Sequence, residues 1–330
     1  MTTFSVAVDR GIRMEDGSSS YPLDPLQAAG LAWSFLDETV DELAPAQVAG
    51  RDAVVLGGAT LTAASLQTDA PPLLVARLGA GFDTVDIDAC TERGVLVTTA
   101  PDGVKRAMAA SGILAVLALA HRLIEKEHRT RAGTWDRTAI GQGIADRTLG
   151  VLGLGNIGRE LCAYAAPFPW RRIGHDKYAA PPEGVEPVDL ETLLRESDYL
   201  VITLPLSDET HHVIDADKLA LMKPTAYLVN IARGPVVDQA ALTTVLTERR
   251  IAGAALDVFE HEPLTVSDPL IALDNVILTG HDIGLTRDMT NDTARSACTS
   301  VIDVAQGRVP ARLLNRDVLD HPRVSALRRP

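Results

Sequence analysis

The stretch TLGVLGLGNIGRELCAYA, residues 148–165, decides the fold. Its apolar beginning predicts a strand at 148–153, and its second half has the spacing of a helix at 156–166. Between the two lies a G-x-G-x-x-G pattern that comprises Gly153, Gly155, Asn156, Ile157 and Gly158. At a strand-to-helix turn, such glycines let the backbone approach a pyrophosphate, whose charge is stabilised by the N–H groups that begin the helix. The stretch therefore predicts a dinucleotide-binding unit.

Short apolar runs and helical patterns alternate on both sides of this stretch, which is typical of βαβ units and parallel sheets. A first set of strands is expected at 4–9, 52–56, 73–78 and 95–98, and a second at 148–153, 172–175, 199–204, 226–230, 252–257 and 276–278. Helices are expected at 103–122, 156–166, 189–196, 215–222, 239–249 and 288–306. The last of these helices is long enough to return to the first set. We therefore expect two α/β domains, with both termini in one of them.

Asp176 ends the strand that follows the glycine-rich turn, 18 positions beyond Gly158. A carboxylate at this point can accept hydrogen bonds from both ribose hydroxyls and repels a 2′-phosphate, so it favours NAD over NADP. The same residue could instead be a solvated loop aspartate or a helix cap. Arg171, Arg172 and Lys177 lie nearby and oppose the preference.

Four polar residues follow predicted strands of the second set: Arg233, Asp257, Glu262 and His281. Ligands of open parallel sheets bind beyond the carboxyl ends of the strands, so these side chains are candidates for one site. Arginine offers a fork of donors to a carboxylate or keto oxygen, and histidine beside a carboxylate can exchange the proton that accompanies hydride transfer.

Each candidate also has a structural interpretation. Arg233 could bridge loops, Glu262 could be a solvated turn charge beside Glu260, and Asp257 could serve only structure. Of the eight histidines, His211 and His212 lie in the polar turn SDETHH and are expected to face solvent.

Composition excludes several classes of protein. A formal net charge of −13 disfavours nucleic-acid binding. The three cysteines, Cys90, Cys162 and Cys298, are far apart and form no C-x-x-C pair, so no metal site or disulfide framework is expected. The beginning of the chain lacks the layout of a signal peptide, and the apolar run 107–120 is shorter than a membrane-crossing helix needs. A cytoplasmic protein is expected.

Long composite motifs resemble the D-isomer-specific 2-hydroxyacid dehydrogenase family. They are ARLGAGFDTVDIDACTERGVLVT at 76–98, VLGLGNIGREL at 151–161, LPLSDETHHVI at 204–214, LMKPTAYLVNIARGPVVDQAAL at 221–242 and IAGAALDVFEHEPL at 251–264. The resemblance covers residues 50 to 315, and the spacing between Arg233 and Glu262 agrees with it.

This resemblance implies a fold class, α/β with two Rossmann-like or flavodoxin-like parallel-sheet domains and a cleft between them. Residues 1–100 plus 286–330 would form the substrate domain and 101–285 the NAD-binding domain. Reversible reduction of a small 2-keto acid with NADH is implied, as is a homodimer through the apolar helix and the loop of Trp135. The implied site residues are Arg233, Glu262 and His281 for catalysis, Gly79, Ala80, Gly81 and Arg233 for the substrate, and Pro205 and Asp257 beside the cofactor.

The chain departs from the family pattern around the histidine. It has Gly280-His281-Asp282 where the family commonly has Pro-His-Ile, so an extra carboxylate follows the proposed acid. In an extended segment Asp282 would turn away from the ring, and otherwise it would act on the ring together with Glu262. The alternative function is that of an NAD(H)-sensing binding protein that resembles the C-terminal-binding corepressors.

Overall fold

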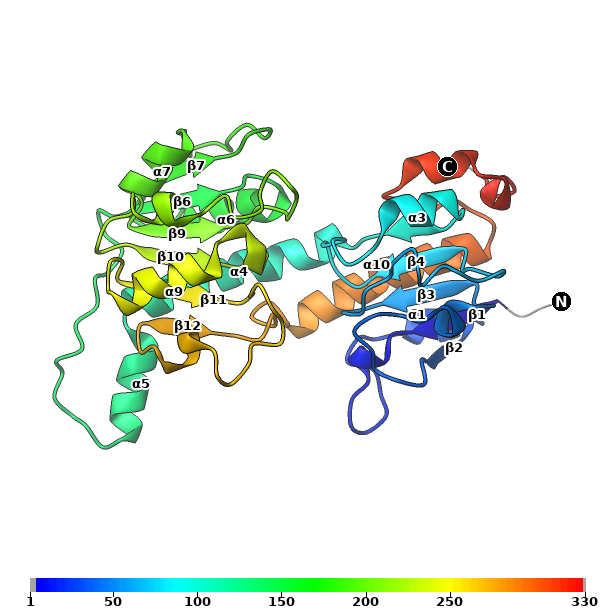
Figure 1. Cartoon of the computed structure of the whole chain (residues 1–330), viewed down its shortest axis with the longest axis horizontal. Helices are drawn as coiled ribbons and strands as arrows, with labels where there is room; N and C mark the ends of the chain where they lie inside the picture. Colours follow the sequence, from blue (N-terminus) through cyan, green and yellow to red (C-terminus); the bar gives the residue numbers. More distant parts are fainter. Residues whose placement is uncertain (1–3, 329–330) are drawn as a thin grey trace. The chain divides into compact units, whose positions relative to one another are not determined.

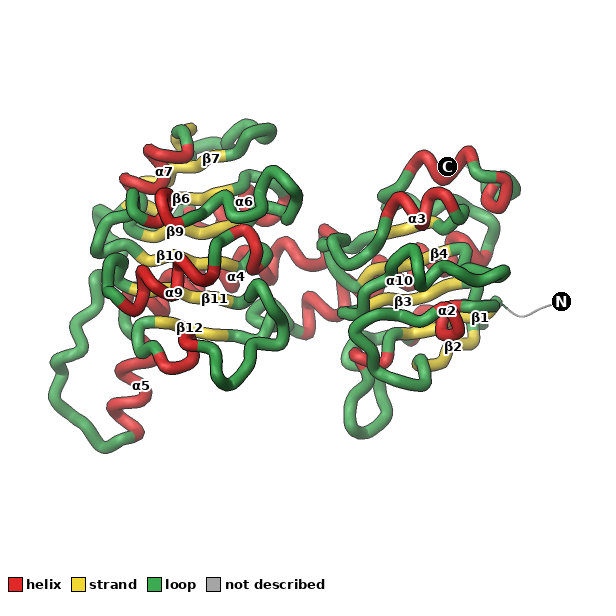
Figure 2. Tube along the Cα trace, in the orientation of Figure 1, coloured by secondary structure: helices red, strands yellow, loops and turns green. Residues whose placement is uncertain are grey.

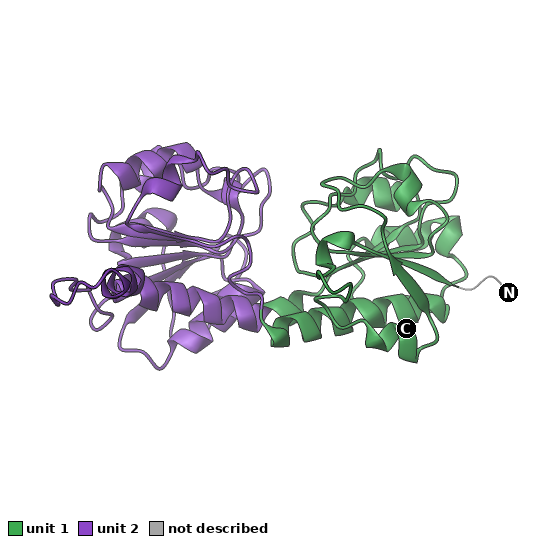
Figure 3. Ribbon diagram, turned by 90° about the horizontal axis from the view of Figure 1, so that it is seen from below, with its two compact units in different colours: residues 1–104, 286–330 green, residues 105–285 purple. Residues whose placement is uncertain are grey.

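A computed structural model describes residues 4–328, and the chain divides into two compact units (Figure 3). Unit 1 comprises Met1–Val104 and Thr286–Pro330, and unit 2 comprises Lys105–Leu285. The expected domains placed these boundaries after residues 100 and 285. Their terminal residues 1–3 and 329–330 lie outside the described residues. Which unit binds which ligand stays a prediction.

Unit 1 contains a five-stranded parallel sheet in the order β2-β1-β3-β4-β5 (Figure 1). Its strands are β1 (Ser5–Val8), β2 (Ala32–Phe35), β3 (Ala53–Leu56), β4 (Leu74–Arg77) and β5 (Leu96–Thr98). Its helices are α1 (Asp24–Ala28), α2 (Pro45–Val48), α3 (Ile87–Glu92) and α10 (Arg287–Ala305), with short 3₁₀ turns at Arg10–Ile12, Arg316–Asp320 and Pro322–Val324. One face of the sheet packs against α1 and α10, and the other packs against α2 and α3.

Unit 2 contains a seven-stranded parallel sheet in the order β12-β11-β10-β9-β6-β7-β8. Its strands are β6 (Thr148–Leu152), β7 (Arg171–His175), β8 (Glu186–Pro187), β9 (Tyr199–Ile202), β10 (Tyr227–Asn230), β11 (Gly253–Leu256) and β12 (Val276–Leu278). Its helices are α5 (Leu123–Arg131), α6 (Asn156–Ala165), α7 (Leu190–Glu196), α8 (Ala216–Leu219) and α9 (Gln239–Thr247), with 3₁₀ turns at Gly234–Val236 and Pro269–Ala272. Helices α7, α8 and α9 cover one face of this sheet, and α6 with the long helix α4 covers the other.

Helix α4 (Pro101–Ala120) is 20 residues long, so it begins before the apolar run that the sequence singles out. It is long and apolar enough to cross a membrane by length and composition, but 61% of its most apolar window is buried inside the protein. Gly112 shows how closely it packs, because a Cβ there would lie 2.5 Å from the side chain of Leu161 on α6. This burial is typical of a core helix.

The predicted strands and helices of both sets are confirmed to within a few residues. Figure 2 shows the helices and strands of the chain in different colours. The sequence patterns do not predict β2, β8, α1, α2, α3 or α5. Each is short or exposed: β2 is a four-residue edge strand, and α5 has no buried residue. Such segments lack the apolar periodicity on which the predictions rest.

The three cysteines are free and buried. Burial raises the pKa of Cys90 to about 12 and the pKa values of Cys162 and Cys298 to about 11. They are therefore core residues rather than nucleophiles.

Candidate functional site

The glycine-rich turn joins β6 to α6 and leaves open space above one glycine. Gly153 has a φ of +97°, and a Cβ on Gly158 would lie 2.0 Å from the carbonyl oxygen of Gly153, so the fold itself needs both glycines. A Cβ on Gly155 would meet no atom within 4 Å. Gly155 is also the N-cap of α6 and gives the helix no side-chain cap. The turn therefore has the open backbone surface and the uncapped helix start that a pyrophosphate needs.

Asp176 follows β7 and is bonded to this turn. Its Oδ2 accepts a 2.7 Å hydrogen bond from the N–H of Leu154, and its Oδ1 accepts bonds from the N–H groups of Tyr178 at 2.8 Å and Ala179 at 2.7 Å. Burial raises the pKa of Asp176, but these three bonds outweigh burial and lower it overall. Asp176 is therefore an ionised carboxylate that supports the loop. Its oxygens keep lone pairs that can accept hydrogen bonds from ribose hydroxyls.

Three cations close to Asp176 in the sequence have partners of their own. Lys177 Nζ lies 2.9 Å from Glu209, which also accepts a 2.6 Å bond from the hydroxyl of Tyr178. Arg171 pairs with two glutamates, and Arg172 donates to the carbonyl of Cys162.

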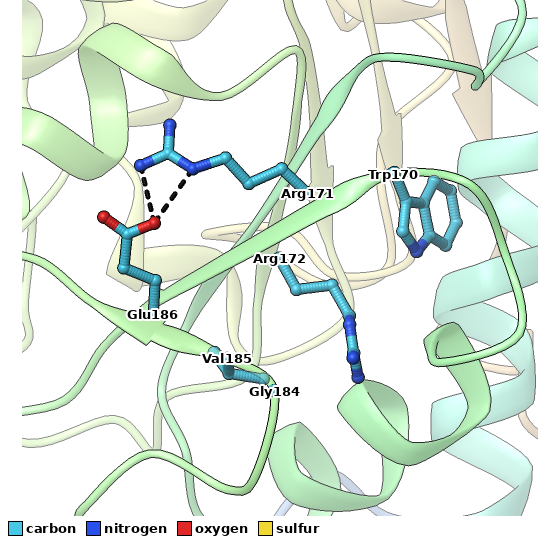
Figure 4. A pocket seen from close by; sticks show the side chains of 6 residues that line it. All are labelled: Trp170, Arg171, Arg172, Gly184, Val185 and Glu186. Atoms are coloured by element: carbon cyan, nitrogen blue, oxygen red, sulfur yellow. Dashed lines mark hydrogen bonds and ion pairs between the residues drawn. The ribbon is translucent and has the colours of Figure 1, made fainter.

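A pocket of about 430 Å³ is lined by Arg171 and Arg172 together with Trp170, Gly184, Val185 and Glu186 (Figure 4). It lies at the start of β7, whereas Asp176 follows the end of that strand. The pocket is therefore separate from the candidate site.

His281 and Glu262 form a hydrogen-bonded pair. Their Nδ1 and Oε2 atoms are 2.7 Å apart, and the side chains are 45% and 35% exposed. Burial raises the pKa of Glu262, but the bond from His281, the N–H of Phe259 and the charge of Arg233 lower it overall. Glu262 is therefore a carboxylate at neutral pH, and its position at Nδ1 leaves Nε2 as the ring nitrogen for proton exchange.

Asp257 shapes the loop that carries His281. The residue is 2% exposed, and its Oδ1 accepts bonds from the hydroxyl of Thr279 at 2.6 Å and from the N–H groups of Asp282 and Ile283 at 3.0 Å. The N–H of His281 donates to the carbonyl of Asp257 at 2.8 Å, which holds His281 at a φ of +60°. Such a left-handed φ is uncommon outside glycine and persists only where surrounding contacts fix it.

Asp282 turns back to its own loop, because its Oδ1 accepts a 3.1 Å bond from the N–H of Gly280. This contact fits the interpretation in which Asp282 serves only the loop.

Arg233 follows β10 and has a braced backbone. The side chain of buried Asn230 accepts from the N–H of Ala232 and donates to the carbonyl of Arg233, both at 3.0 Å. Arg233 itself donates from Nη1 to the carbonyl of Ala232 at 2.7 Å. Since β10, β11 and β12 are neighbours, Arg233, Glu262 and His281 all lie beyond the carboxyl ends of adjacent parallel strands.

The remaining predicted residues lie in separate loops. Pro205 follows β9, is exposed, and accepts a 2.7 Å bond at its carbonyl from Thr210. In unit 1, Gly79, Ala80 and Gly81 follow β4, and the carbonyl of Gly81 accepts a 3.1 Å bond from the guanidinium of Arg77. A Cβ on Gly79 would meet no atom within 4 Å. Within residues 4–328, no three His, Cys, Asp or Glu side chains are grouped as a metal site would require.

His211 is exposed as expected, and His212 is 36% exposed but also has a partner. Its Nε2 lies 2.7 Å from Oε1 of Glu260, so it forms a second histidine–carboxylate pair beside the first. The available signal was its place directly before the apolar pair Val213 and Ile214, the second of which is fully buried.

Known proteins resemble this chain in sequence and in fold. Residues 113–282 match the model of the D-isomer specific 2-hydroxyacid dehydrogenase NAD-binding domain. Similar curated proteins include glyoxylate reductase of Aeropyrum pernix, 42% identical over 77% of this chain and 80% of that protein, and glyoxylate reductase of Thermococcus onnurineus, 40% identical over 76% and 79%. Among solved structures, the TT0316 protein of Thermus thermophilus superposes with a TM-score of 0.84 at 30% identity, covering 94% of this chain and 99% of that one.

Proposed function

Because this chain belongs to the D-isomer specific 2-hydroxyacid dehydrogenase family, we propose that it interconverts a small 2-keto acid and the D-2-hydroxy acid. The similar curated proteins named above are glyoxylate reductases, which supports a small substrate of the glyoxylate type. Hydroxypyruvate and a bulkier 2-keto acid are the other candidates. The observation that carries the proposal is the 2.7 Å pair of His281 and Glu262 beyond the carboxyl ends of β11 and β12.

In the direction of reduction, His281 donates a proton from Nε2 to the C2 oxygen of the substrate. Glu262 stabilises the imidazolium that exists before this transfer, and solvent returns the proton to the ring afterwards. A nicotinamide cofactor, when held by the glycine-rich turn and Asp176, would supply the hydride for C2 and accept it in the reverse direction. Arg233 offers its guanidinium group to the carboxylate or keto oxygen, and its bond to Ala232 orients the fork.

In unit 1, we assign the N–H groups of Gly79, Ala80 and Gly81 to the substrate carboxylate. The absence of nearby atoms above Gly79 supports close approach of a ligand to this backbone. Arg77 supports the same loop through the carbonyl of Gly81.

We propose that the cofactor is NAD(H) rather than NADP(H). Gly153, Gly155, Asn156, Ile157 and Gly158 would hold the pyrophosphate at the start of α6. Asp176 would bind the ribose hydroxyls and repel a 2′-phosphate, and Glu209 neutralises Lys177, the neighbouring cation that could attract one. Pro205 and Asp257 are assigned to the nicotinamide side.

We further propose a cytoplasmic homodimer formed through unit 2. Helix α5 and the loop after it extend from the body of this unit, and α5 buries none of its residues (Figure 1). Several exposed apolar side chains lie on α4, α5 and the following loop, namely Leu114, Leu123, Ile124, Trp135 and Ile140. Exposed apolar groups of this kind mark interaction surfaces.

A substrate panel tests the proposal. Purified protein is mixed with NADH and glyoxylate, hydroxypyruvate or a bulkier 2-keto acid, and loss of NADH absorbance is followed. Turnover of at least one of these acids is expected. Tight NADH binding without turnover across the panel would instead favour the NAD(H)-sensing function, for which the similar proteins give no support.

A further inference from the structure

A second histidine–carboxylate pair lies next to the proposed catalytic pair and has no part in the chemistry above. His212 comes from the loop after β9, and Glu260 from the loop after β11, two residues before Glu262. Their Nε2 and Oε1 atoms are 2.7 Å apart, and the side chains are 36% and 26% exposed. The bond thus links two loops whose strands are separated by β10.

Glu260 is also bonded to the start of α9. Its Oε1 accepts a 3.0 Å bond from the N–H of Gln239, and its own N–H donates to Oε1 of Gln239 at 2.9 Å. Gln239 is the first residue of α9, where the helix dipole favours a negative charge. Nε2 of Gln239 in turn donates to Asp268 at 3.1 Å. Both the backbone and the side chain of Glu260 are therefore fixed.

His212 is fixed from the other side. Its N–H donates to the carbonyl of Pro235 at 2.8 Å, and its backbone has a φ of +50°. Between these loops, a Cβ on Gly234 would lie 1.9 Å from the carbonyl carbon of Phe259 and 2.5 Å from the nitrogen of Glu260. The segment that follows Arg233 therefore lies in direct backbone contact with Phe259 and Glu260.

The fixed turn determines where Glu262 points. The N–H of Phe259 donates to Oε1 of Glu262 at 3.0 Å, which leaves Oε2 for Nδ1 of His281. We propose that His212 and Glu260 are positioning residues, whose bond holds the turn 259–262 so that Glu262 meets His281. This positioning role rests on the proposed function in one respect only: its expected effect on turnover requires an active enzyme.

A double-mutant cycle tests the role through kinetics. His212→Ala removes the donor, His212→Gln keeps an N–H donor of similar reach, and His211→Ala is the matched control from the same exposed turn. Each is made in the parent and in Glu262→Gln. We expect H212A to lower kcat about tenfold in the parent, with H212Q and H211A within about threefold, and to change kcat less than about twofold in E262Q. The Kd for NADH should not change.

Equal losses from H212A in both backgrounds would show a general structural effect and overturn the proposal, as would parent-like kcat in H212A. If H212A does not fold, Glu260→Gln takes its place, since its amide oxygen can still accept from Gln239 while the charged pair is lost. It should lower kcat in the parent and not in E262Q, and any other pattern overturns the proposal.

A readout independent of turnover separates this proposal from the proposed function. In protein labelled with ¹⁵N-histidine, the His281 resonances are assigned by their loss in His281→Ala. In H212A they should move toward their positions in E262Q, and in H211A they should stay. If they stay in H212A, the positioning role is wrong even for an active enzyme. If they move in a protein that reduces no 2-keto acid, only the proposed function fails.

Discussion

His281 and Glu262 lie 19 positions apart in the chain and meet with 2.7 Å between Nδ1 and Oε2. Further hydrogen bonds to the backbone fix both residues of this pair. The backbone of His281 is bonded to the carbonyl of Asp257, and the second oxygen of Glu262 is bonded to the N–H of Phe259. The pair therefore has the fixed orientation that general acid–base catalysis requires.

Replacing His281 by Ala should remove most turnover. A positioned general acid typically contributes ~10²–10⁴-fold, so kcat for 2-keto acid reduction is expected to fall by about that factor. NADH binding, measured by fluorescence titration, should be retained because the glycine-rich turn and Asp176 are unchanged. The exposed His128 provides the control, since its replacement by Ala should leave kcat as in the parent. Near-normal kcat in H281A would remove the residue from the mechanism.

The lowered pKa of Glu262 predicts how its contribution to stability depends on pH. Because the pKa in the folded protein is below the ordinary value of 4.5, the carboxylate stabilises the fold above that pH, and the contribution is lost as pH falls through the lowered pKa. The difference in free energy of unfolding between the parent and Glu262→Gln should thus shrink as pH falls below 4.5. Urea titrations at several pH values measure it. A difference that grows on acidification would contradict the assignment.

Asp257 and Asp282 provide a matched pair of substitutions. Asp257→Asn keeps one acceptor oxygen but replaces the other by an NH2 group and removes the buried charge that accepts three bonds from the loop of His281, and we expect a loss of about tenfold or more in kcat together with a lower Tm. Asp282→Asn keeps an oxygen that can accept from the N–H of Gly280 and removes only the charge, so the pH profile of reductive kcat/KM should superimpose on that of the parent. A downward shift of the alkaline limb in D282N would show instead that Asp282 acts on the ring.

The sequence predicts some parts of the candidate site better than others. The glycine-rich turn is local, and the positions of Arg233, Glu262 and His281 followed from the rule that parallel strands end at the same edge. The pair of His212 and Glu260 could not be found in this way. It requires the loop after β9 to reach the loop after β11 across β10, which no periodicity encodes. The edge strand β2 was missed because four half-exposed residues carry little pattern.

The exposed apolar residues of α5 and the following loop predict how the proposed dimer can be broken. Leu123 is 51% exposed and Trp135 is 80% exposed. Charged substitutions at both positions, Leu123→Glu and Trp135→Glu, should convert the dimer to a monomer, because burying an unpaired charge is costly. Sedimentation equilibrium measures the mass, and Val266→Glu, at a residue 94% exposed in another loop, is the control that should stay dimeric. A monomeric parent would refute the dimer itself.

Glu209 accepts hydrogen bonds from Lys177 and Tyr178, and its replacement should change the preference for NADH over NADPH. The hydrogen bond to Glu209 raises the pKa of Lys177, and Lys177 and Tyr178 together hold Glu209 as a carboxylate with a lowered pKa. Glu209→Gln would remove the negative partner and leave Lys177 available to a 2′-phosphate. We expect the ratio of kcat/KM for NADPH to that for NADH to rise about fivefold, a size suited to exposed charges.

The ratio in Asp176→Ala should rise further, since that change removes the repulsion at the ribose itself. Lys177→Met in the E209Q background is the decisive comparison, because it should return the ratio to the parent value if Lys177 carries the gain. Persistence of the gain without Lys177 would assign it to the lost charge of Glu209 alone. A parent that used NADPH as efficiently as NADH would show that Asp176 does not select the cofactor, and the three bonds from Leu154, Tyr178 and Ala179 would then be its whole function.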